Sequence, residues 1–269
     1  MSNEAGYVQA GNEKLHYLKW GSGKRLLLAF HGYGNDAAIF LPLQEYIGNE
    51  YTILSFDLPF HGESNWAEGS LLTMSSLAAM VRLLMAEYKV DKVSLIGYSM
   101  GGRVCFTIVS CLPESIDKVT LLATDGLAIN GYYYFFTRTY LGKFFFRNML
   151  KNPRPYIKVV EWMKKRNWVH ESRYRFVSYY LQSKESRKLL LKVWPAMRDL
   201  VPDPRKLRSL IKQYRIQVTI FMGKHDKIMP PVIAEKFKSG LDTVQLFILE
   251  KGHRVFDNET AQQIASSLL

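Results

Sequence analysis

Hydrophobic and polar positions alternate along this chain in two patterns. Short apolar, β-branched runs are separated by longer stretches in which apolar residues recur three and four positions apart. The short runs are typical of buried strands and the longer stretches of amphipathic helices. This alternation predicts an α/β fold with a mostly parallel central sheet and helices on both faces. The predicted strands are Lys14–Trp20, Arg25–Phe30, Tyr51–Phe56, Val93–Gly97, Val119–Ala123, Val218–Met222 and Val244–Leu249. The predicted helices are Leu71–Glu87, Met100–Cys111, Val232–Ser239 and Glu259–Leu268.

The alternation stops between Leu127 and Arg215, where the pattern predicts helices only. This interval has 21 Lys and Arg against 5 Asp and Glu, a net charge of +16, whereas the rest of the chain has 15 against 19, or −4. It also holds 18 of the 36 Phe, Trp and Tyr residues. We therefore predict one core domain, made of residues 1–126 and 216–269, with residues 127–215 inserted as a helical cap.

The remaining composition narrows the class of protein. The first residues, MSNEAGYVQAGNEK, are polar and lack an apolar signal core, and no apolar run approaches the length of a membrane span, so we expect a cytoplasmic protein. Cys105 and Cys111 lie on one predicted helix and are expected to be buried and unpaired. The net charge of +12 comes without a zinc-finger, RNP-like or helix-turn-helix signature, so we expect no nucleic-acid partner.

A serine lies among small residues where a predicted strand meets a predicted helix. The residues Gly97, Tyr98, Ser99, Met100 and Gly101 form the pattern G-x-S-x-G. A sharp turn between strand and helix requires small neighbours, and it lifts the serine hydroxyl clear of the sheet's carboxyl edge. The unpaired N–H groups at the start of the helix favour a negative oxygen forming there. Ser99 is therefore the candidate nucleophile.

A serine hydroxyl needs a base, and the base needs a third group that orients it. In this arrangement the acid and then the histidine follow the serine along the chain. His253 lies just beyond a predicted strand, at the sheet edge that carries Ser99, and is the predicted base. Asp226 follows the preceding strand and is the predicted acid, which orients the imidazole and stabilises its charged form. Asp125, at the end of an earlier core strand, is the alternative acid.

The other candidate polar residues have structural interpretations. We expect the His225 ring to bond to loop backbone, His170 to lie on the surface of the insertion and His16 to fill space in an early strand. His31 is expected to bond to the backbone of its own loop. Asp57, at the end of a strand, is expected to support the loop beside the site.

A second glycine-rich turn, FHGYG, follows the predicted strand Arg25–Phe30. Its glycines let the backbone approach a substrate closely. The N–H groups of Tyr33 and Met100 are predicted to form the oxyanion hole. Gly32 and Tyr98, which adjoin them in sequence, are candidates for contact with the substrate.

Five motifs, HGYG, DLPFHGES, GYSMGG, GKHDKIMP and GHRVF, occur in an order and spacing that resembles the α/β-hydrolase superfamily. The resemblance covers Leu26–Asp125 and Val218–Leu269. It implies a sheet of about eight strands, a helical cap inserted after the sixth core strand, and serine-hydrolase chemistry that requires neither a cofactor nor a metal. Phe60 departs from the family pattern D-x-x-G-H-G-x-S, where many members have glycine, and we expect it to narrow the pocket mouth.

These observations predict a serine hydrolase that cleaves an ester or thioester of a largely apolar small substrate through an acyl-enzyme. Arg103 leaves an alternative open, because GYSMGGR resembles the elbow of menaquinone-pathway succinyl-hydroxycyclohexadiene-carboxylate synthases. The resemblance implies a pyruvate-eliminating lyase in which Arg103 binds a substrate carboxylate. The other interpretation is that Arg103 pairs with a neighbouring acid. A ligand sensor with a vestigial triad is the third hypothesis.

Aromatic residues at 132, 136, 140 and 144 fall on one stripe of a helical pattern, which Tyr133, Phe145 and Phe146 widen. We expect this stripe to pack onto the core as a lid over an apolar acyl pocket. The alternative is weak association of a cationic, aromatic helix with an anionic membrane. In both cases the positive field attracts anionic substrates such as CoA thioesters, carboxylates or phospholipids.

Overall fold

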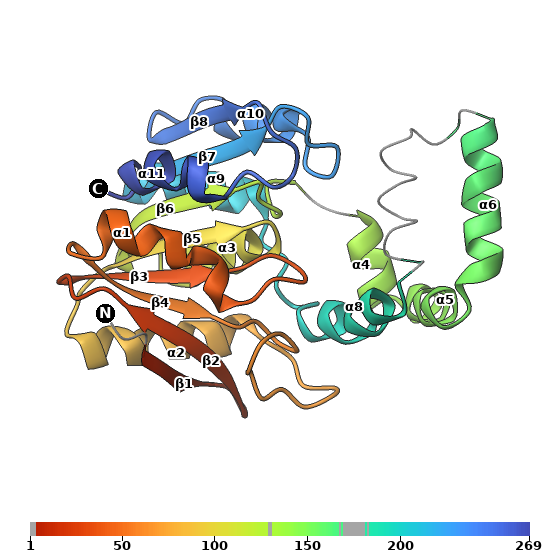
Figure 1. Ribbon diagram of the computed structural model, residues 1–269, viewed down its shortest axis with the longest axis horizontal. Coiled ribbons are helices and arrows are strands. Elements are labelled where there is room, and N and C mark those ends of the chain that lie inside the picture. The colour runs from red at the N-terminus through yellow and green to blue at the C-terminus, as the bar shows by residue number, and fades with distance from the viewer. Residues whose placement is uncertain (1–3, 129–130, 167, 169–180, 182) are drawn as a thin grey trace.

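The computed structural model describes residues 4–128, 131–166, 168, 181 and 183–269. An eight-stranded sheet in the order β1-β2-β4-β3-β5-β6-β7-β8 forms the centre (Figure 1). Strand β2 pairs antiparallel with β1 and with β4, and all the other pairs are parallel. The strands are β1 (Glu4–Ala10), β2 (Glu13–Trp20), β3 (Arg25–Phe30), β4 (Tyr51–Phe56), β5 (Val93–Tyr98), β6 (Ile116–Leu122), β7 (Gln217–Gly223) and β8 (Val244–Leu249). The predicted α/β fold with a mostly parallel sheet is confirmed.

Strand β1 is the one strand of this sheet that the prediction lacks. Within it, Val8 and Ala10 are buried while Tyr7 and Gln9 are exposed, so it carries the alternation of a half-buried strand. Gly11, with φ of +73°, makes the tight turn into β2. Two buried residues among polar neighbours give too weak a pattern to predict a strand from the sequence. Strand β1 forms by hydrogen bonding to the edge of β2.

The central strands are buried on both faces, and their side chains divide between two hydrophobic clusters. In β3, Leu26, Leu28 and Phe30 join one cluster, whereas Leu27 and Ala29 join the other. This is the period of two that a strand imposes. The first cluster includes residues of α2 (Met74–Tyr88), α3 (Met100–Cys111), α9 (Pro204–Tyr214) and α10 (Pro231–Lys238), and the second includes residues of η1 (Ala37–Leu43), α1 (Gln44–Ile47) and α11 (Asn258–Ser266). The 3-10 helix η2 (Pro113–Ser115) precedes β6.

Between β6 and α9, the helices of the described residues extend away from the core (Figure 1). A small cluster beside them is formed by Phe146, Leu150, Leu181 and Leu190, whereas Val193 and Ala196 join the first core cluster. These helices are α4 (Gly131–Arg138), α5 (Tyr140–Lys151), α6 (Pro153–Lys165) and α8 (Lys184–Ala196). Helix α9 lies within the predicted insertion, yet it packs against α3 and places buried side chains in the core cluster. The domain boundaries stay a prediction, with α9 as a helix of the core layer.

Candidate active site

Ser99 lies at the turn between β5 and α3, with φ of 49° and ψ of −113°. A non-glycine residue adopts such a left-handed φ only where its surroundings fix it. Here the Ser99 N–H donates to the carbonyl of Leu122 (2.8 Å), and its carbonyl accepts from the N–H of Asp125 (3.0 Å) and of Gly102 (3.0 Å). The backbone of the serine is therefore anchored to β6, to the segment after β6 and to the first turn of α3.

Two glycines make this turn possible. A Cβ atom on Gly101 would lie 1.9 Å from the carbonyl oxygen of Phe30, and one on Gly97 would lie 2.7 Å from Sγ of Cys105. Both contacts are shorter than packed atoms allow. The pattern G-x-S-x-G thus reflects the close approach of β5, α3 and the end of β3.

Three side chains from distant parts of the chain meet at this turn. The hydroxyl of Ser99 lies 2.9 Å from Nε2 of His253, and Nδ1 of His253 lies 2.7 Å from Oδ2 of Asp226. An ionised carboxylate can only accept a hydrogen bond, so Nδ1 carries the imidazole hydrogen. Nε2 is then the acceptor for the serine hydroxyl. This tautomer leaves His253 ready to take a proton from Ser99.

Asp226 is held in one orientation from its other side. Its Oδ1 accepts from the N–H groups of Ile228 (2.8 Å) and Met229 (2.9 Å), in the loop after β7. The side chain has 0% of its surface exposed, compared with 22% for His253. The loop thus aims the second carboxylate oxygen at His253, while the imidazole reaches solvent.

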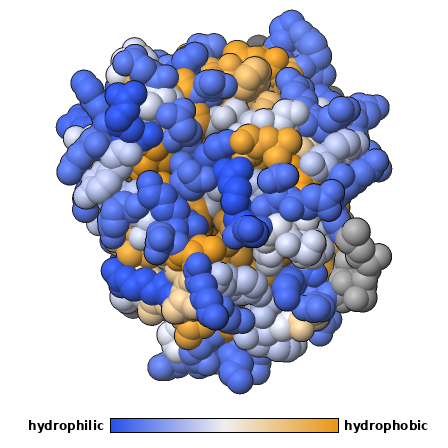
Figure 2. Space-filling view, turned by 90° about the vertical axis from the view of Figure 1, so that its left-hand side faces the viewer, coloured by the Kyte–Doolittle hydropathy of each residue, from blue (hydrophilic) through white to orange (hydrophobic). Residues whose placement is uncertain are grey.

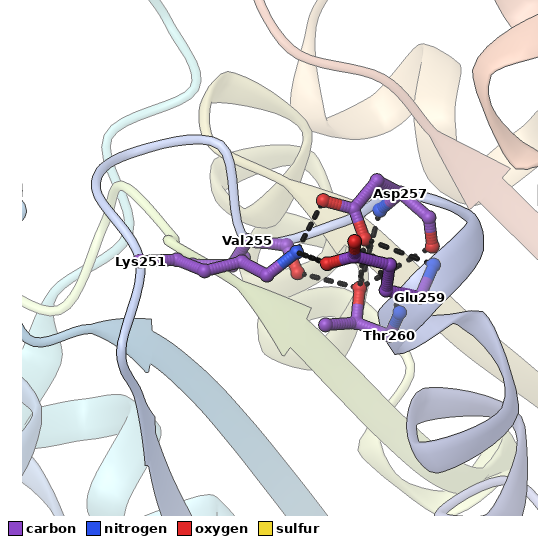
Figure 3. Close-up of polar contacts among 5 residues, drawn as sticks. All are labelled: Lys251, Val255, Asp257, Glu259 and Thr260. Atoms are coloured by element: carbon purple, nitrogen blue, oxygen red, sulfur yellow. Dashed lines mark hydrogen bonds and ion pairs between the residues drawn. The ribbon is translucent and has the colours of Figure 1, made fainter.

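The loop that carries His253 is tied to the start of α11 (Figure 3). Lys251 forms ion pairs with Asp257 and, at 3.1 Å, with Glu259. Asp257 caps α11 by accepting from the N–H of Thr260 (3.2 Å), and the Thr260 hydroxyl donates to the carbonyl of Val255 (2.9 Å). These contacts close the loop on both sides of the histidine. The letters DNET, an acid followed three positions later by Thr before a helix, were the available signal for this network.

The loop after β3 lies against the serine. A Cβ atom on Gly32 would be 2.9 Å from Cδ1 of Tyr98 and 3.2 Å from Cβ of Ser99, so only a glycine fits here without displacing neighbours. Tyr33 is the next residue of this loop. Met100 begins α3, so its N–H is among those with no acceptor inside the helix. Met100 therefore adjoins the nucleophile directly, and Tyr33 follows the glycine that packs against it.

The side chain of Tyr33 connects this loop to the helices beyond the core. Its hydroxyl donates to the carbonyl of Ser186 in α8 (2.7 Å). Its ring packs against both the core cluster and the small cluster of α5 and α8. The sequence alone does not predict this bridge, because an isolated tyrosine in a loop carries no signal of its partner.

The side chains of two histidines form hydrogen bonds that hold the same loop in place. His31 is fully buried, with Nδ1 2.7 Å from the carbonyl of Gly32 and Nε2 accepting from the N–H of Leu58 (2.9 Å). Burial is the largest cause that lowers the pKa of His31, to about 3, so the ring is neutral. His61 accepts from the N–H of Gly34 (3.1 Å). The prediction that His31 bonds to its own loop is confirmed.

The remaining candidate residues lie apart from Ser99. The ring of His225 bonds to the Glu250 carboxylate (3.0 Å), so the expected bond from this ring to loop backbone is wrong. The backbone N–H of His225 does donate to a carbonyl of the neighbouring loop. His16 pairs with Asp57 (2.7 Å). Asp57 also accepts from loop N–H groups, in agreement with its expected supporting role. His170 lies outside the described residues.

Arg103 is almost fully buried, with 8% of its surface exposed. Its guanidinium forms an ion pair with Asp125 and lies 3.9 Å above the ring of Tyr133 in α4. The interpretation that Arg103 pairs with a neighbouring acid agrees with these contacts, whereas a substrate carboxylate would have to displace them. Asp125 is thereby engaged and is not the acid at His253. Tyr98, another candidate for substrate contact, is buried and donates to the carbonyl of His253 (3.4 Å).

The expected aromatic stripe is divided between two helices. Thr139 ends the run of α4 and caps α5 by accepting from the N–H of Gly142 (3.0 Å). After this break Phe146 faces the small cluster, whereas Tyr140 is 90% exposed and Phe144 is 59% exposed. The prediction that the stripe packs as one lid face is therefore wrong for Tyr140 and Phe144. The change of direction at Thr139 sets a new inward face.

The described residues contain neither a candidate metal site nor a candidate membrane-spanning helix. No three or more His, Cys, Asp or Glu side chains in that part of the chain are grouped as a metal ion requires. None of its helices combines the length and the apolar character needed to pass through a bilayer. Cys105 and Cys111 are unpaired, and Cys105 is buried while Cys111 is partly exposed.

Comparison with known proteins supports the assignment of the fold. A family model described as alpha/beta hydrolase fold matches residues 25–259. A dihydrolipoyllysine-residue acetyltransferase component of the acetoin cleaving system of Pseudomonas putida is 29% identical over 94% of this chain, which spans 65% of that relative's length. An uncharacterised hydrolase of Bacillus subtilis is 24% identical over 87% of this chain and 85% of its own. Among solved structures, a thermophilic esterase from Thermogutta terrifontis has a TM-score of 0.65 at 19% identity, covering 98% of this chain and 96% of that one. This last likeness shows the fold alone.

Proposed function

The chain belongs to the α/β hydrolase fold family, and from this we propose that it is a serine hydrolase that cleaves esters or thioesters with a largely apolar acyl part. The observation that carries the proposal is the continuous set of contacts from the hydroxyl of Ser99 through His253 to Asp226. Hydrolases among the relatives support the broader class of activity. The finer chemistry rests on the geometry of the site.

In the proposed mechanism Ser99 attacks the carbonyl carbon of the substrate while Nε2 of His253 accepts the hydroxyl proton. The imidazole becomes positively charged, and the carboxylate of Asp226 stabilises that charge. His253 then returns the proton to the leaving alcohol or thiol, and an acyl-serine remains. Water, deprotonated by the same histidine, attacks the acyl-serine and releases the acid.

The developing negative oxygen is proposed to lie between the N–H groups of Tyr33 and Met100. Preorganised donors of this kind stabilise a transition state because they need no reorientation when charge appears. The packing of Gly32 against Ser99 supports this role, since it fixes the loop beside the nucleophile. The buried ring of His31 holds that loop by accepting from Leu58.

The interval 127–215 is proposed to act as a cap that selects the substrate. Its inner cluster is apolar, and within it the rings of Phe146 and Trp194 stack with centroids 5.2 Å apart. Its net charge of +16 would draw in an anionic substrate. An apolar acyl chain with an anionic group elsewhere, as in a CoA thioester or an acyl carboxylate, fits both properties. Helix α9 belongs to the cap by sequence and to the core by packing.

The test combines active-site labelling with turnover of p-nitrophenyl esters of increasing acyl length. We expect a fluorophosphonate to label the protein and Ser99→Ala to abolish labelling. His253→Ala should lower turnover about a thousandfold or more. His225→Ala is the matched control, because His225 follows a parallel strand at the same sheet edge but pairs with Glu250, and it should retain activity. Labelling that survives Ser99→Ala would contradict the proposal.

The structure favours neither alternative from the sequence. The lyase hypothesis requires Arg103 to meet a substrate carboxylate, and this arginine already has Asp125 as its partner. The sensor hypothesis requires a site that has lost its chemistry, whereas the three polar side chains are in hydrogen-bonding range. The hydrolase therefore remains the proposed function.

A further inference from the structure

Helix α5 presents a second apolar face, directed away from the cluster that it helps to form. Its inward face carries Phe146 and Leu150, which are buried. On the other side Tyr140, Leu141 and Phe144 are all more than half exposed. Large apolar side chains that gather on one exposed helix face, rather than occurring singly, mark an interaction site.

Helix α6 continues this surface. It stands at the end of the molecule farthest from the sheet (Figure 1), and none of its residues is buried. Val159 is exposed, and Trp162 is 45% exposed with Arg166 4.4 Å above its ring. Tyr156 and Ile157 pack against the small cluster, whereas Val159 and Trp162 remain exposed, and exposed apolar side chains on such a helix are expected to meet another surface. We call the exposed residues of α5 and α6 the cap tip.

The cap tip is strongly cationic. Residues 140–166 contain 8 Lys and Arg and a single acid, Glu161. The cations alternate with the exposed rings, so Lys143 and Arg147 flank Phe144 and Lys158 precedes Val159. This combination requires an occupant that is both negatively charged and able to take up apolar side chains.

We propose that the cap tip docks on the surface of an anionic phospholipid bilayer. Rings and aliphatic side chains enter the boundary between head groups and acyl chains, while Lys and Arg remain at the level of the phosphates. A second copy of this chain would bring the same positive charge and be repelled. A nucleic acid would satisfy the charge but leaves Leu141 and Val159 in water.

The opposite end of the molecule has a different character. Figure 2 shows this face of the core as mainly hydrophilic, with hydrophobic residues in small, separated groups. The residues outside the predicted cap, moreover, have a net charge of −4. The charge asymmetry therefore orients the protein with its cap tip toward an anionic surface and its core away from it.

The test is co-sedimentation of the full-length protein with vesicles of phosphatidylcholine alone or with phosphatidylglycerol. We expect binding to the anionic vesicles only, weakening as salt rises. Arg147→Gln with Lys151→Gln, and separately Phe144→Ser with Phe145→Ser, should each weaken partitioning roughly tenfold or more. Arg82→Gln with Lys92→Gln, and Tyr7→Ser with Leu83→Ser, are the matched controls on the exposed surface of the core and should bind as the unmodified protein does.

Absence of binding to anionic vesicles would overturn the proposal, and so would equal loss in the core and cap variants. Binding of the cap tip to RNA but not to anionic vesicles, or formation of a dimer that the Phe144 variant abolishes, would also overturn it. Far-ultraviolet circular dichroism and the thermal unfolding midpoint monitor folding of every variant, independently of activity. Ser99→Ala should bind vesicles normally, so failure of the hydrolase proposal and failure of docking are distinguishable.

Discussion

Replacing Arg103 with Met provides the sharpest test of what this arginine does. Its guanidinium and the carboxylate of Asp125 are both largely buried, with 9% and 13% of their side-chain surfaces exposed. Removing one partner leaves the other charge buried and unpaired, which costs about 3–5 kcal/mol. Loss of the contact with the Tyr133 ring adds about 1 kcal/mol. We therefore expect Arg103→Met to lower the free energy of unfolding by about 4–6 kcal/mol.

The assay is urea unfolding at neutral pH, with the midpoint and the m-value fitted together. The double variant Arg103→Met with Asp125→Asn removes both charges and keeps an acceptor for the N–H of Gly126, which bonds to Asp125 at 2.7 Å. It should recover about half of the loss, because no uncompensated charge remains. A loss below about 1 kcal/mol in Arg103→Met, with a selective loss of activity on anionic substrates, would refute this reasoning and restore the substrate-carboxylate interpretation.

Three further outcomes are expected. Tyr33→Phe removes one hydrogen bond between the oxyanion loop and α8, and it should lower kcat for a short ester about fivefold. Tyr133→Phe is the control, because it removes a 3.2 Å hydrogen bond to α8 that lies outside the oxyanion loop, and it should leave kcat unchanged. Equal effects of the two substitutions on kcat would contradict this expectation. Burial depresses the pKa of His31 to about 3, so the unfolded chain binds a proton at this histidine at a higher pH than the folded protein does. The contribution of His31 to the free energy of unfolding is therefore complete above about pH 6.5 and falls by about 2 kcal/mol at pH 5. Urea unfolding of His31→Gln should show a weaker pH dependence. Asp257→Ala removes the cap of α11 and the partner of Lys251, and thermal unfolding should report a loss of about 1–2 kcal/mol.

The parts of this molecule that follow from local pattern were predictable from sequence. Helix α3 begins and ends at the predicted residues because the strained serine turn fixes its start. The meeting of Ser99, His253 and Asp226 follows from a rule of topology, since loops after parallel strands gather at one sheet edge. Each of these features depends on residues close together in sequence or on strand order.

The parts that depend on distant packing were not predictable. The exposed side of Tyr140 depends on the break at Thr139, which changes the direction of the helix within one continuous aromatic pattern. The partner of Arg103 lies 22 positions away, and a single arginine gives the same signal whether it binds substrate or an acid of the protein. The bond from Tyr33 to α8 spans 153 positions and depends on how the inserted helices lie over the core.

The anchoring of Ser99 by Asp125 also fixes where the chain leaves the core toward the inserted helices. The backbone of Asp125 is fixed to the serine, whereas Gly126, the next residue, has φ of +97°, a conformation that side chains rarely adopt. Leu127, the residue after it, is buried in the first hydrophobic cluster, so the chain is held to the core up to this point on the entry side. The backbone that fixes the attacking oxygen is thus also the backbone that starts the path to α4, and a side chain at Gly126 is expected to disturb both.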